Sequence, residues 1–346
     1  MPFPLKCQVA FVDFFPKTCY NRKKSSFKEL LCVFSKKYYK LIGSVITLLA
    51  LVFVVKKLVT MDVDWSAFAN GRAIGTIGIC TLIQTGVILF MTLPWLLFIR
   101  ILSGAKIPMR DALPVYTRSN LMKYVPGNVF QYVGRNQLAA DLQISHVDVA
   151  CSTLLDIVFC LITPFLLALV LMRKDMLQLF RMYQRNFLII LAAGVAVLIL
   201  AFLLLHWKFR EPLKRYFAKY RKLLSQKAVP QILLVFLLYV AQNLISTAMY
   251  AIPAVLLCDV PAEQLGLFLG TYLFSWIIGF ITPGAPGGIG IREAVMTLMC
   301  GSFLGTETIV LYAVIMRIIS TFGDVLAFLI GLLLEWRFKH TQKATS

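Results

Sequence analysis

The sequence has few charged residues and no grouping of cysteine or histidine that is typical of a metal site. Charged residues make up 15% of the 346 positions, whereas hydrophobic residues make up 59%. The eight cysteines are scattered without a C-x-x-C pair, and the three histidines lie far apart at His146, His206 and His340. We therefore expect no metal site, no disulfide framework and no cofactor.

The residue patterns of common enzymes are missing as well. No Ser–His–Asp set, phosphate-binding P-loop or pair of carboxylates at a catalytic spacing is visible. Because such sets supply the nucleophiles, bases and phosphate contacts of catalysis, the sequence gives no indication of chemistry on a substrate and no candidate catalytic residue.

Acidic residues are scarce, with 16 Asp and Glu against 35 Lys and Arg and a formal net charge of +19. In a soluble protein this excess would suggest a nucleic-acid partner. Here the basic residues cluster in loops beside apolar segments, where anionic lipid and the positive-inside rule account for them. We therefore expect no nucleic-acid partner.

Long apolar runs dominate what is present, and the mean hydropathy is +0.79. Several runs reach the ~20 residues that a membrane-spanning helix needs. The sequence predicts an all-α, multi-pass protein of the cytoplasmic membrane, with about seven to eight transmembrane helices and one or two re-entrant, broken helices. The expected spans are Leu41–Val55, Ala73–Leu102, Val147–Met172, Phe187–His206, Ile232–Leu257, Leu265–Thr282 and Ile309–Leu334.

The distribution of charge predicts three regions and an orientation. Residues 1–40 form a basic cytoplasmic arm, 41–334 the transmembrane domain, and 335–346 a short basic cytoplasmic tail. The basic loop Trp207–Val229 is also expected inside. Seven full crossings would leave the tail outside, so an even count requires Ile291–Phe303 to add a crossing as part of a discontinuous helix.

The most irregular stretch, Ile281–Ala294, has the sequence I-T-P-G-A-P-G-G-I-G-I-R-E-A. Lipid offers the backbone no hydrogen-bond partner, so such a loop at membrane depth is buried in protein or lines a wet cavity. Its glycines can expose N–H groups at the start of a new helix, where Arg292 adds positive charge, and this suits an anionic headgroup. The alternative is a cytoplasmic turn between two ordinary spans.

A second irregular stretch, Lys123–Arg135, has the sequence K-Y-V-P-G-N-V-F-Q-Y-V-G-R. Pro126 precedes Arg135 by nine residues, as Pro283 precedes Arg292. Paired broken segments in the two halves of a chain indicate a possible internal repeat around a central site. The stretch offers cations, tyrosines and amides to a lipid phosphate, although an interfacial amphipathic helix would explain the same residues.

These two stretches resemble the lysylphosphatidylglycerol synthase transmembrane, or flippase-like, family, and the resemblance extends from about Leu41 to Leu334. It implies a membrane domain that translocates a phospholipid or a polyprenyl-linked lipid. Full-length lysylphosphatidylglycerol synthases add a cytosolic aminoacyl-transferring domain. This chain ends at Ser346, twelve residues past Leu334, so we expect no aminoacyl transfer by this polypeptide alone.

We accordingly expect a protein that binds and translocates an anionic membrane lipid such as phosphatidylglycerol. The alternatives are the membrane component of a phosphatidylglycerol lysyltransferase or lipid glycosyltransferase, with catalysis on a separate partner chain, and a structural membrane subunit. The candidate lipid-binding residues are Lys123, Tyr124, Pro126, Gly127, Arg135, Pro283, Gly284, Gly287, Gly288, Gly290, Arg292 and Glu293.

Three further ionisable residues lie within apolar segments, namely Asp156, Arg317 and Asp324. Charged residues in a span usually face the bundle interior and mark a pathway or a paired partner. For Arg317 the sequence leaves open a pathway role or a pairing with either Asp156 or Glu293.

Overall fold

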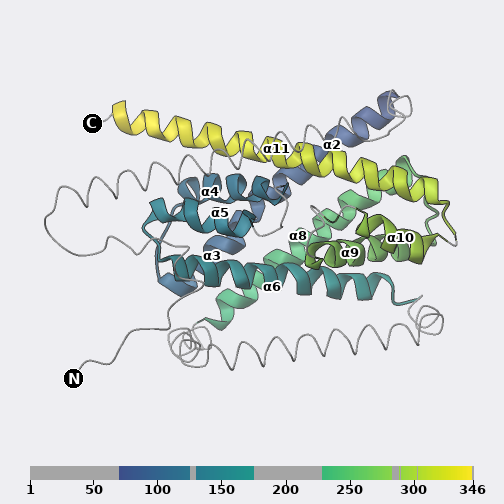
Figure 1. Ribbon diagram of the computed structural model, residues 1–346, viewed down its shortest axis with the longest axis horizontal. Helices are drawn as coiled ribbons and strands as arrows, with labels where there is room; N and C mark the ends of the chain where they lie inside the picture. Colours follow the sequence, from purple (N-terminus) through teal and green to yellow (C-terminus); the bar gives the residue numbers. More distant parts are fainter. Residues whose placement is uncertain are drawn as a thin grey trace, which may run out of the picture. The chain divides into compact units, whose positions relative to one another are not determined.

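A computed structural model describes residues 70–124, 130–174, 228–282, 288, 290–301 and 303–344 (Figure 1). All of them belong to the unit Ile46–Ser346, the larger of two compact units of the chain. Every regular element in these ranges is a helix. The basic arm, the expected spans Leu41–Val55 and Phe187–His206 and nearly all of the basic loop lie outside the described residues.

The first long span consists of α2 (Gly71–Phe90) and α3 (Thr92–Ser103), which together run over 33 residues. Asn70 begins it by accepting a hydrogen bond from the backbone N–H of Arg72. The helix is interrupted at Met91, three residues before Pro94. Pro94 lacks the N–H that would bond to the carbonyl of Phe90, and its ring crowds that carbonyl. The break at Met91 therefore follows from Pro94.

A short antiparallel pair of helices follows, the first hairpin. Its first arm is α4 (Met109–Leu121) with the 3-10 turn η2 (Met122–Tyr124), and its second arm is α5 (Phe130–Leu138) with η3 (Ala139–Leu142). The two arms pack on each other. With 13 residues, α4 rises about 20 Å, less than the ~30 Å of a hydrocarbon core. Neither arm can cross a bilayer alone.

The long helix α6 (His146–Leu171) leads out of the first hairpin. The second half of the chain repeats this order. The long helix α8 (Val229–Leu256) is followed by α9 (Leu265–Ile281) and α10 (Ile291–Cys300), which pack together as the second hairpin. The long helix α11 (Thr306–Ala344) completes it. Both halves of the described chain thus show the same order, a long span, a hairpin and a second long span, which agrees with a possible internal repeat.

Helix α10 bears on the number of crossings. Its ten residues rise about 15 Å, half of a hydrocarbon core, so Ile291–Cys300 is too short for a full crossing and fits a discontinuous helix. Four described helices are long and apolar enough to span a membrane. The expected span Leu265–Thr282 corresponds to α9, a shorter apolar helix of 17 residues.

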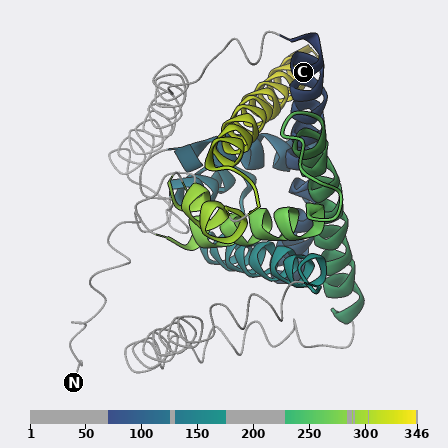
Figure 2. The same cartoon turned by 90° about the vertical axis from the view of Figure 1, so that its right-hand side faces the viewer.

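The two halves of the described chain are cross-packed, in the sense that the last long helix of each half packs on the hairpin of the other half. Helix α11 packs against α4 of the first hairpin, and α6 packs against α9 of the second (Figures 1 and 2). Small residues allow both contacts. Gly331 of α11 lies against Thr117 and Pro114, while Gly270 of α9 lies against Ala168 of α6 and the following Met172. Each long terminal helix therefore holds the hairpin of the opposite half.

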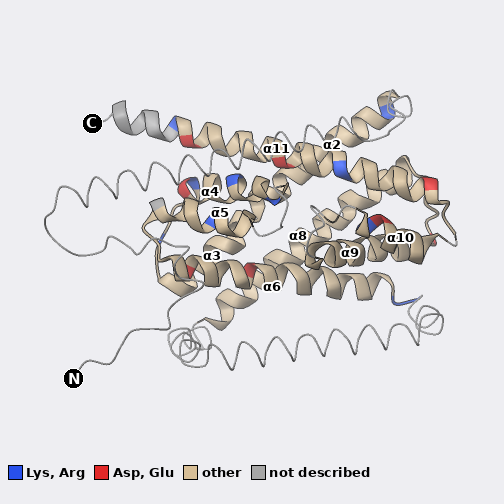
Figure 3. Cartoon of the chain, viewed as in Figure 1, with Lys and Arg blue, Asp and Glu red and all other residues tan. Residues whose placement is uncertain are grey.

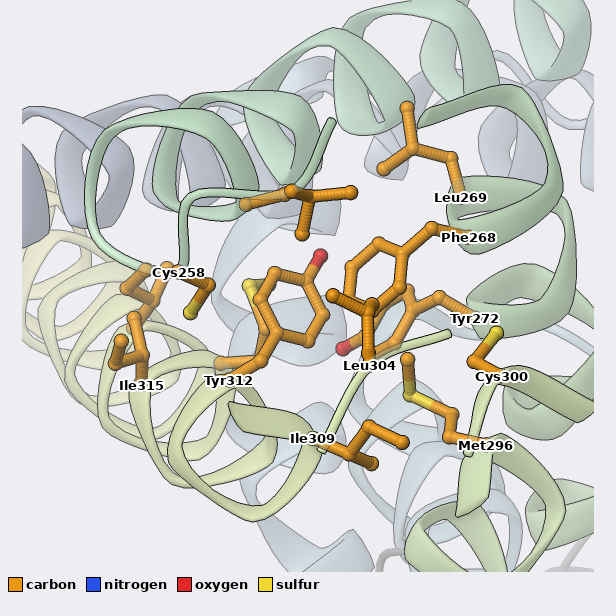
Figure 4. Packing of buried hydrophobic residues seen from close by; sticks show 14 of the residues in the cluster. Cys258, Phe268, Leu269, Tyr272, Met296, Cys300, Leu304, Ile309, Tyr312 and Ile315 are labelled. Carbon is orange, nitrogen blue, oxygen red and sulfur yellow. The ribbon is translucent and has the colours of Figure 1, made fainter. Parts of the chain in front are cut away.

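Two apolar clusters fill the interior. One joins α3, α4, α6 and α8 around Trp95, Phe98 and Tyr239. The other joins α2, α8, α9, α10 and α11, where the rings of Phe268 and Tyr272 meet that of Tyr312 edge-on (Figure 4). Large apolar side chains such as Leu154 and Leu237 remain exposed on the long helices, as expected where lipid tails replace water. The chain is thus an all-α, multi-pass membrane protein.

Candidate functional site

The second hairpin turn is organised around a close contact between two glycines. Gly288 has φ of +73°, and a Cβ added there would lie 3.0 Å from the Cα of Gly279 on α9. The side chain of Arg292 covers the same place, because that added Cβ would lie 2.8 Å from its Nε. A left-handed φ and this packing both require glycine at position 288. The turn backbone, α9 and the arginine are thus pressed together.

Arg292 is the second residue of α10, and it is half-buried. Its guanidinium carbon lies 6.0 Å from the ring centroid of Trp276, which stacks on Phe280. Its Nε is buried and has no hydrogen-bond partner among the described residues. A buried donor without a partner is costly, so this guanidinium is suited to receiving an acceptor from outside the described chain.

The neighbouring Glu293 is engaged on both oxygens. Oε2 accepts a hydrogen bond of 2.8 Å from the backbone N–H of Gly290, whose φ of +84° directs that N–H along the start of α10. Oε1 accepts from Arg317 of α11, with Nε at 3.0 Å and a second bond from Nη2. Of the two partners left open by the sequence, Arg317 therefore pairs with Glu293, and Asp156 has a different cation.

The first hairpin turn is held by a single buried carboxylate. Asp324 of α11 is 1% exposed. It accepts hydrogen bonds from Asn120 Nδ2 at 2.7 Å and from the hydroxyl of Tyr124 at 2.6 Å, and it pairs with Lys123 Nζ at 2.7 Å. All three donors lie at the end of the first arm, immediately before the Pro/Gly turn. Lys123 and Tyr124, two of the donors that the sequence offered to a lipid phosphate, thus bind Asp324.

Arg135, in the second arm, is also paired internally. The guanidinium Nη1 lies 2.7 Å from Asp156 Oδ2 of α6, and both side chains are less than 10% exposed. Tyr239 of α8 donates to the other oxygen of Asp156. The guanidinium also packs on Tyr116 and Trp95, with ring centroids at 4.2 and 5.6 Å. Burial on this scale, with every charge matched, indicates a structural junction between α5, α6 and α8.

Helix α11 brings the two turns together. Arg317 holds the start of α10, and Asp324 holds the end of the first arm, seven residues further along. Figure 3 shows that α11 carries both basic and acidic residues along its length. Seven residues are nearly two helical turns, so both side chains project from one face of α11 about 10 Å apart. The two irregular stretches are 157 residues apart from Pro126 to Pro283, yet their described ends bind to neighbouring turns of one helix.

Pro126, Gly127, Pro283, Gly284 and Gly287 lie outside the described residues. The described members of the candidate set gather at the two turns, except Arg135, which lies farther along α5 in its ion pair. Sequence reasoning missed four residues that shape the site: Asn120, Tyr239, Trp276 and Gly279. Only Asn120, three residues before Lys123, had a local signal.

Comparison with known proteins gives one family. The family described as "Lysylphosphatidylglycerol synthase TM region" matches residues 40–327. This range agrees with the extent of the resemblance carried by the two Pro/Gly stretches. No curated protein and no solved structure matches the chain.

Proposed function

Because the chain belongs to the family of the lysylphosphatidylglycerol synthase TM region, we propose that it binds an anionic lipid headgroup and moves the lipid across the cytoplasmic membrane. The site is the place where the two hairpin turns meet on α11. The lipid is a phospholipid or a polyprenyl-linked lipid, and the site requires no cofactor.

One observation carries this proposal: both Pro/Gly turns are tied to one face of α11, about 10 Å apart, through Asp324 and Arg317. Broken helices that meet near the middle of a bilayer are the usual construction of transporter sites. Two unrelated turns would have no physical reason to share a helix face, whereas two halves of one site would.

At the second turn, Arg292 supplies an unpaired donor. Gly290 leaves the backbone open to a ligand, because a Cβ added there would meet nothing within 4 Å, and Gly288 lets α9 and Arg292 pack on the turn. At the first turn, Lys123 and Tyr124 bind Asp324 and so fix the turn. When the turn moves, both can leave Asp324 and bind the headgroup. Arg135 acts farther away by anchoring α5 to α6. The undescribed residues Pro126, Gly127, Pro283, Gly284 and Gly287 complete the proposed headgroup set.

Movement follows from the cross-packing. The first hairpin is held by α11 and the second by α6, so a shift of either long helix displaces the hairpin of the opposite half. In proteins of this construction, rocking of one half against the other exposes a fixed central site to each side in turn. The ion pairs on α11 then act as contacts that one state makes and the other releases.

A second candidate function rests on the family description, which names a lipid-modifying enzyme. The chain would then be the membrane component of a phosphatidylglycerol lysyltransferase or a lipid glycosyltransferase, and a separate chain would supply the chemistry. The same headgroup site would present the lipid to that partner enzyme.

The test reconstitutes the purified protein in liposomes that contain fluorescent phosphatidylglycerol and follows its quenching by a membrane-impermeant reductant. The proposal expects faster loss of inner-leaflet fluorescence than in empty liposomes, without tRNA or nucleotide-sugar. Arg292→Gln is expected to slow it by about ten- to a hundred-fold, the loss of one charge-assisted hydrogen bond.

The matched control is Arg173→Gln, at an exposed arginine just beyond α6, which is expected to leave the rate unchanged. Lipid movement at the rate of empty liposomes, with a modified lipid formed only when a donor and a partner enzyme are added, would instead establish the second candidate.

A further inference from the structure

Asp324 is a buried carboxylate whose counter-charge is able to leave. It lies inside the span Thr306–Arg337, and its side chain is fully buried, whereas the side chain of Lys123 is 28% exposed. Its Oδ1 accepts hydrogen bonds from Asn120 and Lys123. Its Oδ2 accepts a bond from Tyr124 and pairs with the same ammonium group. Because both oxygens act only as acceptors, the arrangement fits an ionised carboxylate.

The other described cations near this part of α11 have partners of their own. Arg317, seven residues before Asp324 on the same helix, binds Glu293 of α10. Arg118 of α4 binds Glu335, which lies eleven residues beyond Asp324. Among the described residues, the negative charge of Asp324 is therefore balanced by Lys123.

The remaining helices packed against α11 bring no charge to Asp324. Helix α2 lies against the preceding residue, Gly323, with Thr81 and Gln84, which are both uncharged. The one charged residue of α2 is Arg72, in its first turn, and the thiol of Cys80 bonds a carbonyl of α8. Helix α8 itself has no charged residue. If Lys123 leaves, the carboxylate thus loses its counter-charge.

The second buried carboxylate, Asp156, differs in its cation. Its partner Arg135 is 3% exposed, and the guanidinium packs on the rings of Tyr116 and Trp95. Lys123 instead lies in the 3-10 turn at the end of the first arm, and an ammonium group on a flexible stem can change partners more easily than a stacked guanidinium. Of the two buried carboxylates, Asp324 is therefore the one whose ion pair can open.

We propose that Asp324 is a proton-binding site that takes up one proton when Lys123 leaves it for an anionic headgroup. This rests on the proposed function and adds a source of energy to it. A buried carboxylate without a counter-charge is strongly destabilised, and uptake of a proton removes that cost. The proton comes from water and forms an O–H bond on one carboxylate oxygen. Lys123 keeps its own proton, because the headgroup replaces the lost partner.

Coupling of this kind makes lipid movement respond to pH. Because a proton and a lipid bind together, each must strengthen the binding of the other by the same factor. If the proton is released on the side where the lipid leaves, each pH unit across the membrane shifts the distribution of the lipid about tenfold. Carboxylates within spans serve as proton relays in other transporters.

The experiment titrates short-chain phosphatidylglycerol into the purified full chain in phosphatidylcholine nanodiscs. The solution is weakly buffered and contains a pH indicator, and the titration is repeated across the neutral pH range, where the phosphodiester keeps its single charge. The wild-type protein is expected to take up about one proton per bound lipid and to bind about tenfold more tightly for each pH unit lowered. Empty nanodiscs give the background.

Three variants assign the proton. Asp324→Asn, which has no group to protonate, is expected to bind the lipid without proton uptake and with an affinity that does not change with pH. Lys123→Gln is expected to lose the uptake as well, because Asp324 then has no counter-charge to exchange. The matched control is Glu335→Gln, since this carboxylate also joins α11 to α4 but is 25% exposed. It is expected to keep both the uptake and the pH dependence.

The outcomes separate this proposal from the proposed function. Binding of phosphatidylglycerol by the wild type without proton uptake overturns the proton site and leaves the lipid site standing. Uptake that persists in Asp324→Asn overturns the assignment to this residue. If Asp324→Asn does not fold, the wild type and Lys123→Gln still decide the matter. Binding no stronger than in empty nanodiscs at every pH overturns the proposed function itself.

Discussion

The ion pair between Arg135 and Asp156 allows a quantitative prediction, because both side chains are nearly inaccessible, at 3% and 8% exposure. Asp156→Ala leaves the guanidinium of Arg135 without a counter-charge among the aromatic rings of Trp95 and Tyr116. Removing one partner of a buried pair costs about 3–5 kcal/mol, because the remaining charge stays desolvated. Tyr239 also loses its acceptor, which adds to that cost.

The matched control is the pair of Arg118 with Glu335, which joins α4 to α11 at 3.0 Å. Its side chains are 26% and 25% exposed, so the water that replaces a lost partner is close at hand. Glu335→Ala is therefore expected to cost about 0–1 kcal/mol. Both variants remove one carboxylate that bonds an arginine between helices, and they differ chiefly in burial.

The assay is thermal or urea-induced unfolding in detergent, followed by tryptophan fluorescence, to which Trp95 beside Arg135 contributes. The double variant Arg135→Met with Asp156→Leu removes both charges and is expected to recover much of the stability lost in Asp156→Ala, since apolar residues can replace a buried pair at little cost. Equal losses for Asp156→Ala and Glu335→Ala would refute the argument from burial.

Two glycine substitutions test the packing in the same assay. Gly288→Val is expected to destabilise the protein by about 1–3 kcal/mol through its positive φ and to abolish lipid binding, because a side chain there meets Arg292 and Gly279. The control is Gly75→Ala on α2, where a Cβ meets nothing within 4 Å. Equal effects of the two substitutions would contradict the reasoning. Gly331→Ala is expected to destabilise the contact of α11 with Thr117 on α4 by about 1–3 kcal/mol. Gly86→Ala, where the added Cβ lies in open space, is expected to leave the stability unchanged. An unchanged stability in Gly331→Ala would show that α4 and α11 can move apart to accommodate the methyl group.

The described spans could be predicted closely because each is an apolar run with polar flanks. Val147–Met172 was expected and α6 covers His146–Leu171; Ile232–Leu257 was expected and α8 covers Val229–Leu256. The last span was expected to end at Leu334, whereas the helix α11 continues for ten more residues to Ala344. Hydropathy detects where a helix leaves the apolar layer but not where the helix ends.

The first hairpin shows why the site could be predicted only in part. Its stretch from Ser103 to His146 is too polar for an ordinary span, yet Arg135 and Gln131 are buried within it. The positive charge of Arg135 is compensated by Asp156, and that of Lys123 by Asp324, which lies 201 residues further along the chain. No local pattern indicates which distant carboxylate meets which cation.

The shared nine-residue spacing also concealed a difference between the two arginines. Arg135 is the sixth residue of α5, buried and paired, whereas Arg292 is the second residue of α10 with an unpaired Nε. The shared spacing therefore predicted neither the same place in the helix nor the same role, because the pairing of each arginine depends on other helices that the spacing does not describe.

The order of the helices predicts that the two hairpins lie on opposite sides of the membrane. Between the loop at Lys106, before the first hairpin, and the loop at Ala262, before the second, lie α6, the span expected at Phe187–His206 and α8. Three crossings invert the side, so cysteines at these two exposed positions, in a background free of other cysteines, are expected to react with an impermeant reagent from opposite sides. By the positive-inside rule we expect Lys106 to lie inside with the basic tail, and Ala262, beside Asp259 and Glu263, to lie outside. Labelling of both loops from the same side would contradict the placement of the two hairpins on opposite sides of the membrane. It would also contradict the reason to expect a site that opens to each side in turn.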